Sequence, residues 1–124
     1  MILLDTNYLL RFLTNDIKTQ AADAKKLIKY SIEINVPVVA IAETVYFLRN
    51  YYKIGKTQIV DKLTSLLQQK NIKCESYAHD ALQIYEKEII SFYDCLILGE
   101  ALKLEGELTT FDEKLQKVYK KYLG

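Results

Sequence analysis

The chain has only two cysteines, one histidine, one proline and four glycines among its 124 residues, and it has no tryptophan. Two cysteines, Cys74 and Cys95, form neither a disulfide framework nor a Cys-x-x-Cys clip. A single histidine excludes a His-rich zinc site and any mechanism that needs several histidines. The sequence also shows no linker, no low-complexity tract and no internal repeat.

The chain also lacks an excess of charge of one sign and long apolar runs. The chain has 17 Lys and Arg residues against 16 Asp and Glu residues, so only local basic clusters can hold a nucleic acid. The longest largely apolar stretch, Val36 to Leu48, has 13 residues and is interrupted by Glu43, whereas a membrane span needs about 18. The apolar run at the N-terminus lacks the basic region and the length of a signal peptide. We therefore expect a cytoplasmic protein without a membrane partner.

What is present indicates one globular domain over residues 1–124, because half of the residues are apolar and a domain takes roughly 100–200 residues. Short apolar segments alternate with segments of helical periodicity. They predict strands at 1–4, 33–38, 72–75 and 107–110, and helices at 6–13, 16–30, 37–52, 57–69, 78–89, 91–104 and 112–122. This alternation is typical of an α/β sandwich with a mainly parallel sheet, in which sites form beyond the carboxyl ends of the strands.

Glu43 lies in an unusual setting for a carboxylate. Its helical neighbours three and four positions away are apolar or aromatic: Val39, Ala40, Tyr46 and Phe47. We expect this face to be buried, where a carboxylate costs several kcal/mol unless it is paired, metal-bound or protonated. The alternative is that Glu43 lies at the edge of the stripe and reaches water or pairs with Arg49.

Two further acids follow predicted strands. Asp5 ends the first apolar run and Asp112 follows the last one, which places both at strand ends where α/β sites lie. Each also has a structural alternative. Asp5 or Thr6 can cap the next helix, and Thr110 with Glu113 matches a capping box.

Asp94 opens a late apolar helix, and Ser91 with Asp94 also matches a capping box. Jointly, the four acids suit metal-assisted hydrolysis of a phosphodiester. Mg²⁺ and Mn²⁺ prefer carboxylate oxygens, and a bound ion activates water without a histidine base.

The four acid motifs, in this order, resemble the PIN-domain ribonucleases. The length of the chain and the order of the motifs are similar to those of the VapC-type toxins of toxin–antitoxin pairs. The motifs that carry the resemblance are Asp5-Thr6-Asn7, Glu43 in a helix after a short strand, Asp94, and Thr109-Thr110-Phe111-Asp112.

The resemblance implies a three-layer α/β/α sandwich with a mainly parallel sheet of four or five strands. It implies an endoribonuclease that depends on Mg²⁺ or Mn²⁺, with Asp5, Glu43, Asp94 and Asp112 as the catalytic, metal-coordinating quartet. Thr6, Asn7 and Thr110 match the polar positions that support the acidic quartet in this family, and we expect them to orient the carboxylates. It also implies a homodimer and a small antitoxin protein that reaches into the acidic pocket, often with an arginine.

Arg11 and Arg49 are the better candidates for contact with RNA phosphate, because a guanidinium can bridge phosphate with two hydrogen bonds. Salt bridges to acidic neighbours are the alternative role. Tyr8 and Tyr93 adjoin motif residues and are the better candidates for base stacking. The remaining aromatic residues suit a core or a dimer interface.

The sequence thus predicts a metal-dependent endoribonuclease, the toxin of a VapBC-type pair. The alternatives are a housekeeping RNA-processing nuclease of the same family and a non-catalytic module that binds RNA or protein. A phosphotransfer domain on a similar sheet is less consistent with the chain, because no lysine directly follows the last expected strand.

Overall fold

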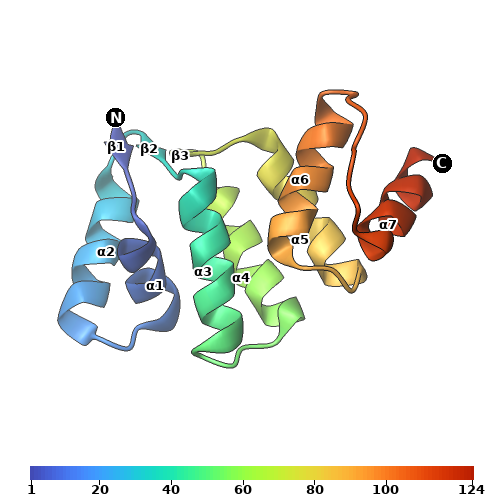
Figure 1. The fold of residues 1–124 in the computed structure, drawn as a ribbon. Coiled ribbons are helices and arrows are strands. Elements are labelled where there is room, and N and C mark those ends of the chain that lie inside the picture. Colours follow the sequence, from blue (N-terminus) through green and yellow to red (C-terminus); the bar gives the residue numbers. More distant parts are fainter. The chain divides into compact units, whose positions relative to one another are not determined.

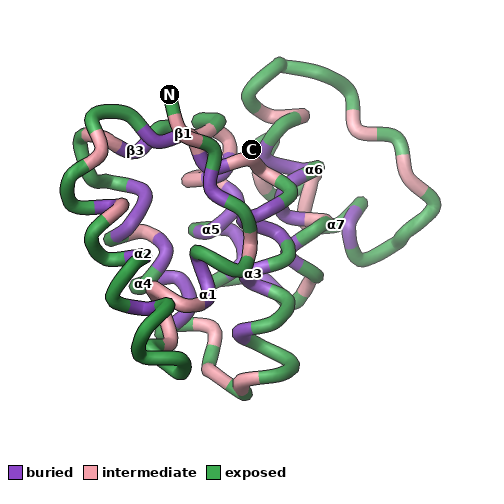
Figure 2. The backbone as a smooth tube through the Cα atoms, turned by 90° about the vertical axis from the view of Figure 1, so that its left-hand side faces the viewer, coloured by how far each residue is buried: buried purple, intermediate pink, exposed green.

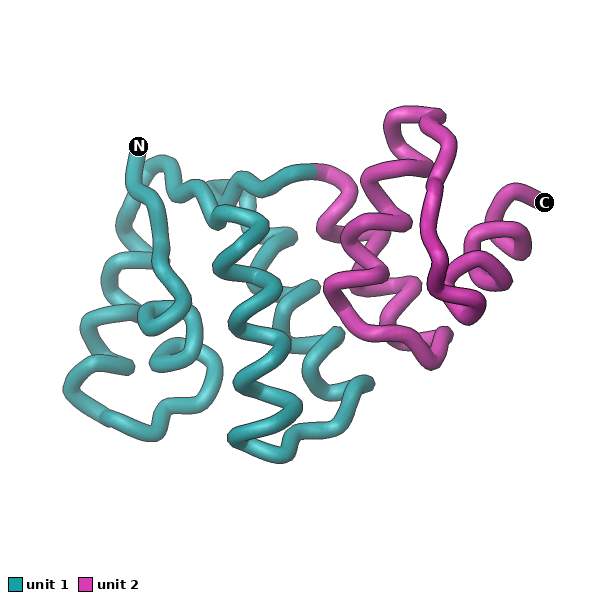
Figure 3. The backbone as a smooth tube through the Cα atoms, in the orientation of Figure 1, with its two compact units in different colours: residues 1–75 teal, residues 76–124 magenta.

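The computed structural model describes residues 1–124, which form two compact units. The first unit comprises Met1–Glu75 and the second Ser76–Gly124 (Figure 3). Every strand belongs to the first unit, and the second unit is helical. None of the helices is both long enough and apolar enough to cross a lipid bilayer.

The sheet of the first unit has three short strands in the order β1-β2-β3. They are β1 (Ile2–Leu3), β2 (Ile34–Asn35) and β3 (Ile72–Lys73). Both pairings are parallel, with Ile2 opposite Ile34 and Ile34 opposite Ile72. The predicted parallel α/β arrangement is therefore confirmed, although each strand is shorter than the sequence pattern indicates.

Four helices accompany this sheet: α1 (Thr6–Thr14), α2 (Lys18–Tyr30), α3 (Val38–Asn50) and α4 (Lys56–Leu67) (Figure 1). Helix α1 packs against α2 and α3, and α3 packs against α4. Their apolar faces form a core, which contains fully buried side chains such as Leu9, Ile41, Leu48 and Ile59. Figure 2 shows buried and exposed positions alternating along the helices, as amphipathic helices require.

The second unit consists of α5 (Ser76–Lys87), α6 (Phe92–Lys103) and α7 (Glu113–Leu123). Helices α5 and α6 pack closely, and α7 packs against α6. The close packing depends on Gly99 in α6, because a Cβ atom there would lie 3.1 Å from the backbone oxygen of Tyr77. A larger residue at this position would push the two helices apart.

The strand predicted at residues 107–110 is not formed. These residues have no regular secondary structure and lead from α6 to α7. A strand needs a partner for its backbone N–H and C=O groups, and the second unit contains no strand. The apolar pattern of this segment therefore predicted a strand for which its own unit offers no partner strand.

Candidate functional site

Asp5 lies where the sequence predicts it, just beyond the carboxyl end of β1. It is the N-cap of α1, and its carboxylate accepts a hydrogen bond from the backbone N–H of Tyr8 at 3.0 Å. The capping role considered as an alternative is therefore formed. A carboxylate has two oxygens, and the cap uses only Oδ1, so the exposed side chain keeps acceptor capacity toward the solvent.

Glu43 in α3 is connected to the same place through Thr6. The Thr6 hydroxyl donates a hydrogen bond to Oε1 of Glu43 at 2.7 Å, which joins the first turn of α1 to α3. Asp5 and Glu43 line one shallow pocket of about 220 Å³, together with Leu3, Leu4, Thr6, Pro37, Val39 and Ala40. The structure thus brings together two acids that are far apart in the sequence.

The prediction that Glu43 lies on a buried face is wrong. Its carboxylate is exposed, and so are three of its four helical neighbours: Val39 (67% exposed), Tyr46 (51%) and Phe47 (39%). Helix α3 is apolar nearly all round, and its buried side is formed instead by Ala40, Ile41, Ala42, Thr44, Val45 and Leu48. Periodicity cannot identify the buried side of such a helix. Arg49 does not pair with Glu43 but donates to the carbonyl oxygen of Ile54 at 3.4 Å.

Asp94 and Asp112 belong to the second unit, each at the start of a helix. Asp94 is half-buried in the first turn of α6, and its backbone N–H donates to Oγ of Ser91 at 3.1 Å. Asp112 is the exposed N-cap of α7, and its carboxylate accepts from the N–H of Leu115 at 3.0 Å. The hydroxyl oxygen of Thr110 accepts from the N–H of Asp112 at 3.1 Å. Asp94 therefore lies three residues after the Ser91 cap, as its capping pattern predicts, whereas α7 is capped by Asp112 itself and not by Thr110 as the capping-box pattern indicated.

Each unit contributes two of the four predicted acids. Within either unit, no three His, Cys, Asp or Glu side chains gather as a group that could hold a metal ion. A quartet thus requires both units.

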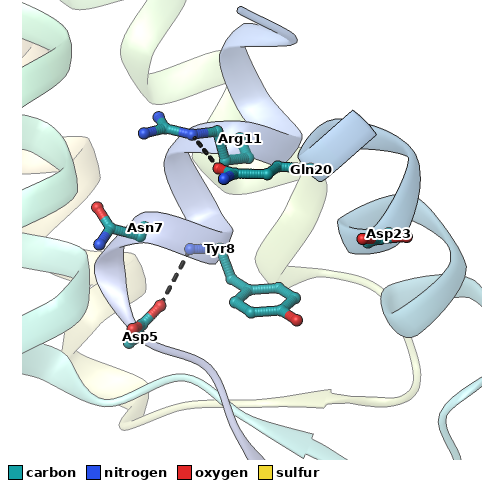
Figure 4. A pocket seen from close by; sticks show the side chains of 6 residues that line it. All are labelled: Asp5, Asn7, Tyr8, Arg11, Gln20 and Asp23. Carbon is teal, nitrogen blue, oxygen red and sulfur yellow. Dashed lines mark hydrogen bonds between the residues drawn. The ribbon is translucent and has the colours of Figure 1, made fainter. Parts of the chain in front are cut away.

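A second pocket also includes Asp5. It measures about 380 Å³ and is lined by Asp5, Asn7, Tyr8, Arg11, Gln20 and Asp23, from α1, its cap and α2. In Figure 4 the Tyr8 side chain leaves α1 toward α2, where Gln20 and Asp23 lie. Asp5 therefore lines two pockets, one shared with Glu43 and one with the facing side of α2.

Arg11 is held in place by its neighbours. Its Nε donates to Oε1 of Gln20 at 2.8 Å, and its Nη1 lies 3.5 Å from a carboxylate oxygen of Asp16. The hydroxyls of Tyr52 and Thr14 donate to the same carboxylate at 2.6 and 2.9 Å. The hydrogen bond from Tyr52 is the largest influence that lowers the pKa of Asp16 below its usual value. The salt bridge that was the alternative for Arg11 is therefore formed.

Sequence reasoning missed Gln20 and Asp23 as pocket residues. They stand three positions apart on α2, so they share one helix face, but nothing in their own neighbourhood distinguishes them from a solvated surface. Only the packing of α1 against α2 places this face beside Asp5.

Residues 2–121 match the PIN domain family. The chain is 29% identical to a VapC ribonuclease of Aquifex aeolicus (strain VF5) over 124 aligned residues, which cover 95% of this chain and 92% of that protein. No solved structure gives a significant match. Because the family match extends over nearly the whole length and across both units, the chain belongs to the PIN domain family.

Proposed function

We propose that the protein is an endoribonuclease that hydrolyses RNA phosphodiester bonds as the toxin of a VapBC-type toxin–antitoxin pair. The observation that carries this proposal is the PIN domain match over residues 2–121, together with the similarity to a VapC ribonuclease over 95% of the chain. The pairing of Asp5 with Glu43 at one pocket supports it from the structure.

The two units act as one nuclease domain in this proposal. Asp5 and Glu43 supply half of the acidic site from the first unit, and Asp94 and Asp112 supply the other half from the second. The continuous family match across both units supports this joint site. We also propose the finer fold that the resemblance implies, a three-layer sandwich whose mainly parallel sheet has four or five strands.

The donor set fits a hard divalent cation. Asp5 and Glu43 are exposed carboxylates that line one pocket, and carboxylate oxygens are the ligands that Mg²⁺ and Mn²⁺ prefer. These two residues, joined by Asp94 and Asp112, would hold the ion. When bound, such an ion would lower the pKa of a coordinated water and neutralise charge on the phosphate.

Residues around the acids hold them in position. Thr6 donates a hydrogen bond to Glu43 at 2.7 Å, and this bond limits the rotation of the carboxylate. Thr110 accepts the N–H of Asp112 and shapes the turn before α7. Asn7 lines the neighbouring pocket beside Asp5. We assign these three residues to positioning, because groups that orient ligands affect metal affinity and activity strongly.

The exposed apolar side chains of α3 favour protein partners. Val39, Tyr46 and Phe47 surround Glu43 at the surface, and exposed apolar clusters mark interaction sites. We propose that this protein works in the cytoplasm, that it forms a homodimer, and that a small antitoxin covers the acidic pocket.

RNA cleavage tests the function directly. The full chain is incubated with a mixed-sequence RNA and Mn²⁺ or Mg²⁺, with and without EDTA, and the products are resolved on a gel. We expect cleavage that EDTA abolishes and that Asp5→Asn reduces by about a hundredfold or more, because the removed charge belongs to the proposed metal site.

Asp61→Asn is the matched control, since it removes an exposed acid on α4 that lines neither pocket at Asp5. It should cleave like the unmodified chain. Cleavage that persists in EDTA would exclude the metal mechanism. Absence of cleavage with RNA binding retained would instead identify the non-catalytic module.

A further inference from the structure

The pocket between α1 and α2 has walls of distinct chemistry. Tyr8, on α1, is 42% exposed and presents its aromatic ring, and Gln20 and Asp23 on α2 present polar groups (Figure 4). Its volume of about 380 Å³ lies at the lower end of the range for small-molecule sites. An aromatic wall beside polar groups is the arrangement that receives an unpaired nucleobase, because every base can stack and each has its own pattern of donors and acceptors.

The orientation of Gln20 is set by Arg11. A guanidinium N–H can only donate, so the amide oxygen of Gln20 must face Nε of Arg11, as the 2.8 Å hydrogen bond shows. The amide NH₂ group of Gln20 therefore points away from Arg11 and is a donor. Asp16 also contacts Arg11, at 3.5 Å from Nη1, so Arg11 has two partners that favour this orientation of Gln20.

Asp23 supplies the opposite character on the same face of α2. Its ionised carboxylate only accepts hydrogen bonds, and it has no hydrogen bond or ion pair within the protein. The pocket thus presents an amide donor at Gln20 and a pair of acceptor oxygens at Asp23, three residues along the helix.

This pattern favours guanine over the other bases. The Watson–Crick edge of guanine has two adjacent N–H donor groups, N1–H and N2–H₂, which match the two carboxylate oxygens, and an O6 acceptor next to them for an amide NH₂. Adenine and cytosine each offer a single amino donor on that edge, and the one N–H of uracil lies between two carbonyl oxygens that a carboxylate repels.

The location of the pocket gives the base a role. Asp5 lines this pocket and also the pocket that contains Glu43. A base bound against Tyr8 would therefore belong to a nucleotide adjoining the one whose phosphate meets the acids. We propose that the pocket of Tyr8, Gln20 and Asp23 binds an unpaired guanine next to the scissile phosphate and so selects where RNA is cut; the cutting itself rests on the proposed nuclease function.

Binding of the four nucleoside 5′-monophosphates, measured in EDTA by NMR titration of the full chain, tests the pocket without catalysis. All four ligands share ribose and phosphate, so differences in Kd report the base. We expect GMP to shift the resonances of Tyr8 and Gln20 and to bind about tenfold more tightly than UMP. Asp23→Asn should remove most of this difference, because its amide keeps one acceptor and adds a donor. Tyr8→Leu should weaken all four ligands about equally.

Asp61→Asn is again the matched control and should keep the preference for GMP. Equal binding of the four ligands would overturn the proposal, and so would a preference that survives Asp23→Asn.

Mapping of cut sites on mixed-sequence RNA separates the two proposals. GMP preference without any cleavage would retain the guanine pocket and reject the nuclease. Metal-dependent cleavage with no guanine beside the cuts, or with a cut pattern unchanged by Asp23→Asn, would retain the nuclease and reject the role of the pocket.

Discussion

A single hydroxyl group connects the two acids of the first unit. Thr6 follows Asp5 directly in the chain and donates to Glu43 across the α1–α3 contact. Since Glu43 is exposed, this hydrogen bond, rather than burial, limits the positions of its carboxylate. A threonine next to a strand-end aspartate thus has a role that its capping propensity alone would not indicate.

Thr6→Val tests this role, because valine keeps the shape of threonine and removes the donor. We expect RNA cleavage to fall about tenfold to a hundredfold, since loss of an orienting partner has effects of about that size on metal affinity or activity. The melting temperature should change little, because the hydrogen bond lies at the surface. The measurement is the cleavage rate as a function of Mn²⁺ concentration.

Thr57→Val on α4 changes an exposed threonine in the same way and should leave the cleavage rate unaltered. Serine at position 6 keeps the donor and should restore most of the activity. A Thr6→Val protein with the full rate at every Mn²⁺ concentration would show that Glu43 needs no orientation by Thr6.

At the scale of elements, α7 is anchored to the segment after α5 by a nearly buried acid. The Glu88 side chain is 10% exposed, and it accepts hydrogen bonds from Nζ of Lys121 at 2.9 Å and from the hydroxyl of Tyr122 at 3.2 Å. The Lys121 ammonium is the largest influence that holds the pKa of Glu88 below its usual value, although desolvation acts in the opposite direction. This cluster ties the terminal helix to its unit.

The lowered pKa of Glu88 makes stability depend on pH. The unfolded carboxyl has a pKa of 4.5, so its ionised form stabilises the fold above that pH, and the contribution is lost as the pH falls through the lower folded value. Lys121→Gln should reduce the free energy of unfolding at pH 7, because the Glu88 carboxylate loses its charged partner. Thermal melts between pH 3 and pH 7 measure the effect.

The difference between Lys121→Gln and the unmodified chain should shrink as the pH falls through the lowered pKa of Glu88, because the carboxyl then becomes protonated in both proteins. Lys120→Gln serves as the control, since Lys120 is an exposed neighbour on the same helix. A constant difference at every pH would show that the ion pair does not carry the effect.

At the scale of the whole molecule, the proposed site depends on both units, because each holds two of the four acids. An ion that binds only the folded, joined form stabilises it by mass action, by about 2.7 kcal/mol when its concentration is a hundred times Kd. We expect millimolar Mn²⁺ to raise the melting temperature and to slow amide hydrogen exchange in both units.

Glu43→Gln and Asp94→Asn test the two units separately. Each variant should shrink the shift caused by Mn²⁺, and each should melt at the same temperature as the unmodified chain, or higher, without metal, because one repelling charge is gone. Asp61→Asn should keep the full shift. A full Mn²⁺ shift in Asp94→Asn would place that acid outside the metal site and separate the second unit from it.

Local patterns predicted the order of the helices well, because helical periodicity and capping act over three or four residues. Asp5 and Ser91 are N-caps, as their patterns indicate, whereas α7 is capped by Asp112 and not by Thr110. The predicted PIN family is confirmed by the match over residues 2–121. The segment 107–110 was predicted wrongly as a strand, because strand formation depends on a partner elsewhere in the chain.

The sequence alone determined which acids are available, at which helix and strand ends they stand, and to which family the chain belongs, since these follow from neighbouring residues and motif order. Tertiary packing decided that Thr6 reaches Glu43, that the stripe around Glu43 faces water, and that Gln20 and Asp23 form a pocket with Tyr8. These contacts join separate helices, so their geometry depends on how α1 packs against α2 and α3, which no local pattern encodes.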